Sequence, residues 1–236
     1  MPVNWYQLGQ DIFGESENDR SGKSLSFSDN GKILAIGAHY ANEGGHVRIY
    51  KNNSGTWEQI GSDIDGEKKN DESGYSVSLS SDGSIVAIGA VKNDGSGKNS
   101  GHVRIYKNNS GSWEQIGSDI DAESRADNFG VSVSLSSDGS IVAIGANKND
   151  ANDNNSGHVR VYKNNSGTWE QIGSDIDGKN AGDLFGSSVS LSSDGSIIAI
   201  SGYKNDVNGS NSGHVRVYKN NSGSWEQIGS DIEGTK

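Results

Sequence analysis

The chain has 236 residues, with 20 basic and 31 acidic side chains and a formal net charge of −11. No basic face for nucleic acid is apparent in this balance, and it disfavours binding to an anionic membrane surface. There is no Cys, so no disulfide framework forms. No apolar run reaches the ~18 residues that span a bilayer, and the first residues, 1–7, show no export signal. We therefore expect no nucleic-acid partner and no membrane insertion.

Tryptophan marks an internal repeat that accounts for almost the whole chain. The intervals between successive Trp residues are 52, 56, 56 and 56, for Trp5, Trp57, Trp113, Trp169 and Trp225. Self-similarity at a period of this length is typical of repeat architectures. It excludes an ordinary enzyme domain built on a single core.

The unit 57–112 predicts four strands in chain order. Residues 75–80 alternate apolar and small polar side chains, which predicts strand A, and Asp82-Gly83 follows as a tight turn. Residues 84–90 contain a continuous apolar run, typical of a strand buried on both faces, and form strand B. After a polar loop, residues 102–107 predict strand C.

A second turn and a fourth strand complete the unit. Asn108-Asn-Ser-Gly111 is rich in residues that tolerate left-handed conformations, and residues 113–120 predict strand D. Four short antiparallel strands per unit are typical of a propeller blade. A β-solenoid or a row of small sandwiches is the alternative. We expect an all-β fold, a β-propeller of four-stranded antiparallel blades.

The predicted organisation is one propeller domain over 1–236. Its expected parts are a D strand at 5–12 and four blades at 22–64, 74–120, 130–176 and 186–232. Five D strands serve four blades, so either Trp5–Ile12 or Trp225–Ile232 completes the last blade. The surplus strand is then either loose or paired with another molecule. We therefore expect a monomer or a homodimer, and two chains that close a head-to-tail contact would pool their blades into a larger ring.

One stretch of the third unit resembles a known family. Asp127–Ala146, with Phe129-Gly130 near its start and Gly145-Ala146 at its end, resembles the FG-GAP repeat of integrin α-chain propellers. Residues 157–162, Gly-His-Val-Arg-Val-Tyr, look like the third strand of that family, and Phe185-Gly186 begins a similar stretch. The resemblance implies a propeller used for extracellular adhesion or recognition. It alone favours an extracellular or cell-surface location.

The chain also departs from that family. Ser21-Gly22 and Ser73-Gly74 replace Phe-Gly, and Ser201-Gly202 replaces Gly-Ala. The integrin-type calcium loop between strands A and B is absent. The calcium sites of the family are therefore not carried over to this sequence.

The units differ from one another mainly at one end of the blades. Units 57–112 and 113–168 differ at 14 of 56 positions, and twelve of these fall in residues 66–75 and 91–98. These segments are the D–A and B–C loops, which lie at the same end of an up-and-down blade; with their equivalents we call them the variable face. Either this face binds partners or its loops simply tolerate change. The first unit is shorter by four residues, all within 39–45.

The B–C loops of the variable face supply the candidate binding residues. They are Lys92, Asn93, Asp94, Lys148, Asn149, Asp150, Asp153, Lys204, Asn205 and Asp206. Asp and Asn oxygens are suitable ligands for Ca²⁺, but no loop matches a calcium-binding pattern. We expect no cofactor, with calcium as the weaker alternative.

Four histidines open strand C, each two residues before an Arg; they are His46, His102, His158 and His214. A ring of His could bind a metal, yet no ligand spacing accompanies them, so a repeated packing contact is expected. No nucleophile elbow or paired acids occur. We therefore expect no metal site, no catalytic residues and no enzyme activity.

These observations favour a non-enzymatic interaction or adhesion module. It would bind a protein or glycan ligand multivalently through the loops of the variable face. One alternative is a lectin-like glycan binder with a weak site in each blade. The other is a structural scaffold without a specific ligand.

Overall fold

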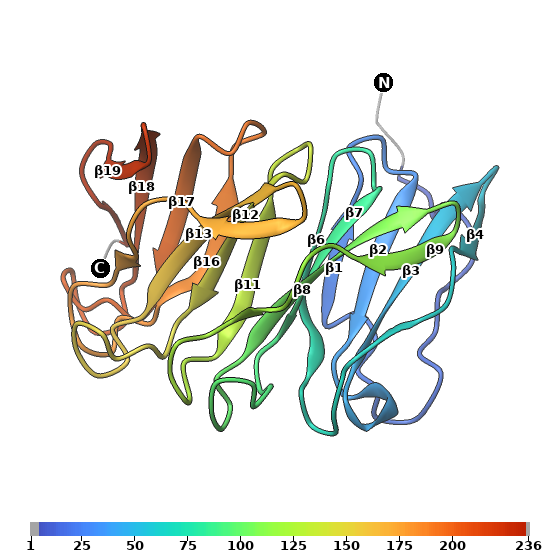
Figure 1. Ribbon diagram of the computed structural model, residues 1–236, viewed down its shortest axis with the longest axis horizontal. Helices are drawn as coiled ribbons and strands as arrows, with labels where there is room; N and C mark the ends of the chain where they lie inside the picture. Colours follow the sequence, from blue (N-terminus) through green and yellow to red (C-terminus); the bar gives the residue numbers. More distant parts are fainter. Residues whose placement is uncertain (1–4, 235–236) are drawn as a thin grey trace.

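The computed structural model describes residues 5–234 and shows four antiparallel sheets standing in a row (Figure 1). The expected domain over 1–236 includes residues 1–4 and 235–236, which lie outside the described residues. The only helical element within 5–234 is the 3₁₀ turn η1 (Ala41–Glu43). No helix in this part of the chain is long and apolar enough to cross a membrane.

Each sheet is one repeat unit, and we call it a blade. Blade 1 contains β1 (Ser24–Phe27), β2 (Ile33–Ala38), β3 (His46–Asn53), β4 (Thr56–Gln59) and β5 (Ile64–Asp65). Blade 2 contains β6 (Ser73–Leu79), β7 (Ile85–Ala90), β8 (His102–Asn109), β9 (Ser112–Gln115) and β10 (Ile120–Asp121). Blade 3 contains β11 (Phe129–Leu135), β12 (Ile141–Ala146), β13 (His158–Asn165), β14 (Thr168–Gln171) and β15 (Ile176–Asp177). Blade 4 contains β16 (Phe185–Leu191), β17 (Ile197–Gly202), β18 (His214–Asn221), β19 (Ser224–Gln227) and β20 (Ile232–Glu233).

The predicted all-β fold of four-stranded antiparallel blades is confirmed, with one local difference. The expected strand 113–120 is interrupted: β9 and β10 are separate, and both pair with β8. The interruption contains Gly117, whose φ is +74°, and a Cβ there would lie 2.4 Å from the carbonyl oxygen of Gly167. The same positive φ recurs at Gly229 of blade 4, which no following blade within 5–234 approaches, so the left-handed glycine itself ends the first half of strand D.

Neighbouring blades pack face to face, and we call each such contact a joint. The joint between blades 2 and 3 buries Val103 and Ile105 of one sheet against Val133 and Ile144 of the next. A Cβ on Gly89 would lie 2.1 Å from the carbonyl oxygen of Gly130, so only glycine allows the backbones to come this close. The hydrophobic core is thus a series of three joints rather than one centre.

The tryptophans of strand D anchor each blade to the one before it. Trp113 donates its indole N–H to the carbonyl oxygen of Ile60, 3.0 Å away, and Trp169 and Trp225 make the same bond one and two blades on. Partial burial of the ring and a satisfied N–H together make it an anchor. The structure thus gives these side chains the packing role that their repetition indicates.

The two candidate strands for completing the last blade have different positions. In blade 4, β19 and β20 pair with β18, so the C-terminal segment completes its own blade. Residues 5–12 form no strand. They lie beside blade 1, where the carbonyl oxygen of Leu8 accepts the indole N–H of Trp57 at 2.9 Å. Residues 5–14 therefore stand where the strand D of a preceding blade would be.

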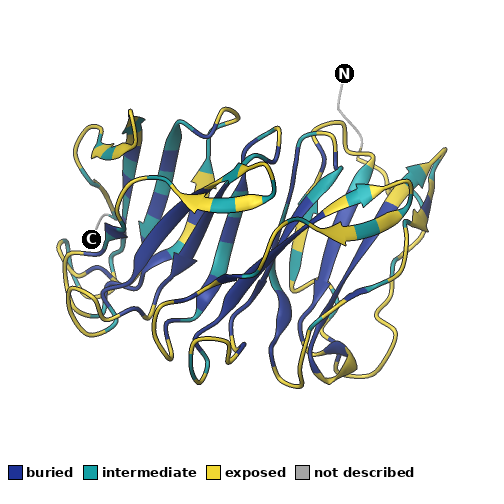
Figure 2. Cartoon of the chain, in the orientation of Figure 1, coloured by how far each residue is buried: buried dark blue, intermediate teal, exposed yellow. Residues whose placement is uncertain are grey.

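The row of blades is open. Blade 1 and blade 4 lie at opposite ends of it in Figure 1, and the strands of blade 4 carry partly exposed segments where the middle strands are buried (Figure 2). Ala143 in blade 3 is fully buried, whereas its equivalent Ala199 in blade 4 is only partly buried. The outward faces of blades 1 and 4 thus resemble the faces that meet in a joint, but no neighbouring blade covers them among the described residues.

Candidate functional site

The variable face contains a cleft of about 630 Å³ formed by loops of the first three blades. Its lining comes from the loop before β1, the loop after β2, the start of β6 with the loop before it, and the loop after β7, with single residues from the loops of blade 3. The lining residues are Arg20, Ser21, Gly22, Lys23, His39, Tyr40, Glu72, Tyr75, Val91, Lys92, Asn99, Asn128 and Lys148. Four of these residues, Arg20, Lys23, His39 and Tyr75, have no equivalent of the same residue type in blades 3 and 4.

Two tyrosine rings hold two of its cations in place. The guanidinium carbon of Arg20 lies 4.3 Å from the ring centroid of Tyr40, and the ammonium nitrogen of Lys23 lies 4.2 Å from that of Tyr75. Both distances are typical of cation–π contacts. The positive charges are therefore ordered at the cleft before any ligand arrives.

A carboxylate and an imidazole lie among the cations. Glu72 is buried and pairs with Lys92 at 2.5 Å, which raises the pKa of that lysine. His39 is buried against the rings of Tyr40 and Tyr75, and its Nδ1 has no hydrogen-bond partner among the described residues. Burial lowers the pKa of His39, so its imidazole is neutral at pH 7.

The cleft is electropositive in an acidic protein. Arg20, Lys23, Lys92 and Lys148 face one carboxylate, Glu72, whereas the whole chain carries a formal charge of −11. Such a concave cluster of one sign concentrates the field and attracts the opposite charge. The arrangement is suited to bind and neutralise an anionic group.

The structure brings together only two of the lysines expected to bind. Lys92 and Lys148 both line the cleft. Lys204, at the equivalent position of blade 4, does not line it and lies 6.0 Å from the ring centroid of Tyr203. Three equivalent loop positions thus have different surroundings, because only blades 1 to 3 contribute to the cleft.

The three expected asparagines are structural ties. Asn93, Asn149 and Asn205 are buried. Their amides donate to buried aspartates of the preceding D–A loop, at 3.0 Å for Asn93 and Asp71, and the other two repeat this bond with Asp127 and Asp183. These side chains hold the B–C loop to the D–A loop and are not free to contact a ligand.

The expected aspartates brace the same loops from outside. Asp94, Asp150 and Asp206 are exposed, and each accepts a backbone N–H five residues on at 2.7 Å. Asp153 accepts the N–H of Asn154 within its own loop. These carboxylates remain reachable from solvent, and their contribution to binding or to calcium stays a prediction.

The residues most specific to the cleft were not among those predicted. Arg20, Lys23, His39 and Tyr40 belong to the first unit. The comparison of units 57–112 and 113–168 does not include that unit and so could not identify them. The signal was nevertheless present: His39 is the one histidine outside the periodic set, and it lies in the segment where the first unit is shorter. A unique residue in a repeat is a stronger indication of a site than a repeated one.

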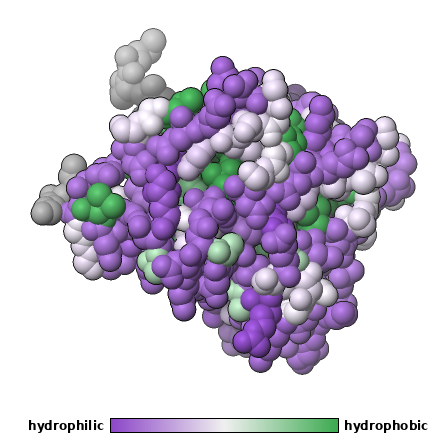
Figure 3. Space-filling model, turned by 60° about the vertical axis from the view of Figure 1, so that its left-hand side comes forward, coloured by the Kyte–Doolittle hydropathy of each residue, from purple (hydrophilic) through white to green (hydrophobic). Residues whose placement is uncertain are grey.

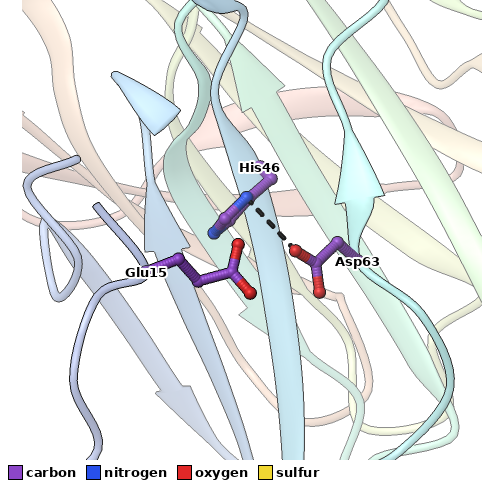
Figure 4. A group of neighbouring side chains, drawn as sticks. All are labelled: Glu15, His46 and Asp63. Carbon is purple, nitrogen blue, oxygen red and sulfur yellow. Dashed lines mark ion pairs between the residues drawn. The ribbon is translucent and has the colours of Figure 1, made fainter. Parts of the chain in front are cut away.

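The periodic histidines lie next to carboxylates that the sequence did not reveal. Nδ1 of His46 is 3.4 Å from Asp63, with Glu15 beside them (Figure 4). His102 and His158 have the equivalent aspartates, Asp119 and Asp175, at 3.5 and 3.4 Å. The aspartate follows the histidine by 17 residues at the end of strand D, so only folding brings the two together.

An arginine pairs with a carboxylate in two of these clusters. Arg48 lies 3.5 Å from Glu15, and Arg160 contacts Asp175. Arg104 of the remaining cluster donates instead to the carbonyl oxygen of Asp65.

Arg160 donates two hydrogen bonds to Asp175, at 2.9 and 2.8 Å, and also pairs with Glu123. Burial, and then the charge of this arginine, lowers the pKa of His158 to about 4. The fixed guanidinium already supplies the positive charge that the carboxylates need, and a metal ion would have to compete with it. This geometry favours an ion-pair network that ties strand C to strand D.

Comparisons with known proteins agree on the architecture. The family model described as FG-GAP repeat matches residues 63–106, 119–162 and 176–218, together more than half of the chain. The comparison with curated proteins finds no match.

Similar solved structures include a Bacteroides uniformis protein assigned as a 6-phosphogluconolactonase, with a TM-score of 0.61 and 17% identity, covering 90% of this chain and 55% of that one. The periplasmic gluconolactonase of Pseudomonas aeruginosa has a TM-score of 0.58 and 17% identity, with coverage of 91% and 57%. The β-propeller domain of the trilobed protease of Pyrococcus furiosus has a TM-score of 0.51 and 13% identity, with coverage of 89% and 57%.

At these identities the likeness concerns the fold alone. The chain spans little more than half the length of each of these proteins. The three matches of the family model and the four joined blades lead to the same conclusion: this chain belongs to the FG-GAP repeat family of β-propeller proteins.

Proposed function

We propose that this protein is a non-enzymatic interaction module that binds partners through its variable face, and that the cationic cleft receives a carboxylate-bearing segment of a partner protein. The observation that carries the proposal is the cluster of four cations and two tyrosines in one cleft of an acidic chain. An ordered cation pairs with a carboxylate more readily than a free side chain does, because less conformational entropy is lost on binding.

The position of the cleft also supports binding. Loops on a rigid scaffold are where recognition residues concentrate, and the cleft lies on the face where the units differ most. Glu72 supports specificity, because it pairs with Lys92 and sets the geometry of the anion site. A cationic cleft both steers an acidic partner and fixes its orientation.

The experiment measures binding of a fluorescein-labelled hexaglutamate peptide by anisotropy, with a hexalysine peptide as the negative probe. We expect the hexaglutamate peptide alone to bind, with an affinity that falls as salt is raised. Lys148→Glu should weaken binding by about tenfold, equivalent to about 1.4 kcal/mol. Lys204→Glu is the matched control, since it changes the same loop position outside the cleft, and it should change binding by less than about twofold.

Equal effects of the two substitutions would contradict the cleft, because they would reflect the overall charge only. No binding of hexaglutamate by the unaltered protein would contradict the proposed ligand class. A glycan array with and without Ca²⁺ tests the lectin-like alternative, for which neutral glycans would bind and Lys148→Glu would have no effect. Binding in neither experiment would favour a structural scaffold.

The absence of catalysis is a separate part of the proposal. Two similar structures are lactonases by name, and a phosphorylated lactone would bring an anion to the cleft. We expect hydrolysis of 6-phosphogluconolactone no faster in the presence of the protein than in buffer. A protein-dependent rate that Lys148→Glu abolishes would contradict the non-enzymatic assignment.

A further inference from the structure

The outward side of blade 4 has the composition of a buried joint but lies exposed. Its open face is formed by Ile197, Ala199, Val215, Val217, Ile228 and Ile232. Ile232 is 62% exposed, while its equivalent Ile176 in blade 3 is 4% exposed. Figure 3 turns this end of the molecule toward the viewer and shows separate apolar patches in a hydrophilic surface.

One position distinguishes this face from the covered ones: Ser201 stands where blades 1 to 3 have Gly37, Gly89 and Gly145, which approach the backbone of the next blade. A blade that covers this face must therefore lie further away at Ser201 than in the three joints.

The outward side of blade 1 is the complementary half. Leu25 and Phe27 of β1 are 60% and 55% exposed. Their equivalents in blade 2, Val77 and Leu79, are 9% and 7% exposed because blade 1 covers them. The open face of blade 1, formed by these two residues with Leu34, Ile36 and Tyr50, therefore corresponds to the side that receives a preceding blade.

Hydrogen-bonding groups at the two ends also correspond. In the first joint, Ser24 Oγ donates to the carbonyl oxygen of Gly74 at 2.8 Å, and the backbone N–H of Leu79 donates to Ser26 Oγ at 2.9 Å. Both bonds repeat in the next two joints.

At the ends of the row the same groups lack their partners. Ser188 and Ser190 of blade 4 are the equivalents of Ser24 and Ser26, and no following blade faces them among the described residues. Blade 1 offers the matching backbone N–H at Phe27. The carbonyl oxygen of Gly22 is the other equivalent group, and the side chain of Ser201 would lie beside it.

Residues 5–14 lie against blade 1 and resemble the C-terminal segment of blade 4. They are identical to residues 225–234 at six of ten positions, and the carbonyl oxygen of Leu8 accepts from Trp57 as that of Ile60 does from Trp113. The segment thus imitates the end of blade 4 at the place where a blade 4 would dock. Blade 4 keeps its own copy of this segment through pairing with β18 and an ion pair between Arg216 and Asp231 at 2.8 Å.

We propose that two copies of this chain associate head to tail, the open face of blade 4 of each covering the open face of blade 1 of the other. Residues 5–14 cap the face of blade 1 in the single chain and are displaced when the second copy docks. Each copy has one face of each kind, so closing both contacts gives a finite pair rather than a fibre. The displaced segment competes with the partner and weakens the association.

Engineered cysteines test the contact directly, because the chain has no native cysteine. In the first joint the side chains of Asp29 and Ser81 are 2.6 Å apart. The equivalent residues at the proposed contact are Ser193 of one copy and Asp29 of the other. Under mild oxidation, Asp29→Cys with Ser193→Cys should form covalent pairs of chains. Asp29→Cys with Ser81→Cys is the positive control and should crosslink within one chain.

Surface variants decide whether the proposed faces cause the crosslink. Adding Ile232→Lys or Leu25→Lys to the Asp29→Cys/Ser193→Cys chain should abolish the covalent pairs. Val207→Lys is the matched control, because Val207 is equally exposed, at 63%, but lies in a loop outside the open face. It should leave the crosslinking unchanged. Deleting residues 1–14 should strengthen the association of the native chain by about tenfold.

An absence of covalent pairs while the positive control crosslinks would overturn the proposal, and so would pairs that Ile232→Lys does not affect. A weaker association after deletion of 1–14 would overturn the competing role of that segment. Charge reversal in the cleft should leave the association unchanged, so failure here and failure of the proposed binding function are distinguishable.

Discussion

The outward faces of blades 3 and 4 present almost the same side chains in different surroundings. Val159 and Val161 are 0% and 1% exposed because blade 4 covers them, whereas their equivalents Val215 and Val217 lie partly in solvent. The hydrophobic contribution of a residue scales with the apolar area removed from water. The repeat therefore sets which residues form a face, and the neighbouring blade sets how much that face stabilises the protein.

The largest expected effect is a difference in the free energy of unfolding when equivalent isoleucines on a covered face and on an open face are replaced by Ala. Ile176→Ala should lower the free energy of unfolding by about 2–4 kcal/mol, because it leaves a cavity in the joint with blade 4. Ile232→Ala should lower it by about 0.5 kcal/mol or less in the dilute single chain. Urea unfolding of both variants measures the difference. Equal losses would show that blade 4 is covered in the single chain.

The next effect concerns pH, and it compares a middle histidine with a terminal one. Burial lowers the pKa of His158 to about 4, so the unfolded chain takes up a proton first on acidification. The contribution of neutral His158 to the free energy of unfolding is complete above pH ~6.5. It is lost as the pH falls toward 4, and the loss is about 3 kcal/mol at most.

His158→Gln should reduce the proton uptake on unfolding near pH 5 by about one. His214, whose pKa burial also lowers, lies at the open end, and His214→Gln should reduce the uptake less. Urea unfolding at several pH values gives the slope for each variant. A steeper slope in the His158 variant than in the unaltered protein would contradict the lowered pKa.

The smallest effect separates the anchoring tryptophans from the exposed one. Trp113→Phe removes the hydrogen bond to Ile60 and should cost about 1 kcal/mol. Trp5 is 95% exposed, and Trp5→Phe should leave the melting temperature unchanged. Thermal unfolding followed by circular dichroism measures both. A fall for Trp5→Phe in dilute solution would mean that this side chain is already packed.

The sequence was sufficient for the local structure of the blades. Alternation at residues 75–80, the apolar run 84–90 and the Asp-Gly turn are short-range signals, and each became the expected strand or turn. The split of strand D was missed although its signal is local: a glycine with a positive φ interrupts the strand at Gly117, and the equivalent Gly229 does so in blade 4, where no described blade follows.

The candidate site was less accessible to prediction because it depends on contacts between units. Lys92 and Lys148 were predicted because they repeat. They form a cleft only together with Arg20 and His39, which come from a different unit. Asn93 looked like a surface ligand in the sequence and is buried against Asp71. Composition and period identify the scaffold, whereas a site built by three blades requires their arrangement in space.

The mass of the protein in solution tests the difference between covered and open faces most directly. Sedimentation equilibrium over a range of concentrations should show a species of about 50 kDa, twice the 24.9 kDa of one chain. Ile232→Lys should return it to the mass of one chain. A mass of 24.9 kDa at every concentration, or a pair that Ile232→Lys leaves intact, would contradict the account.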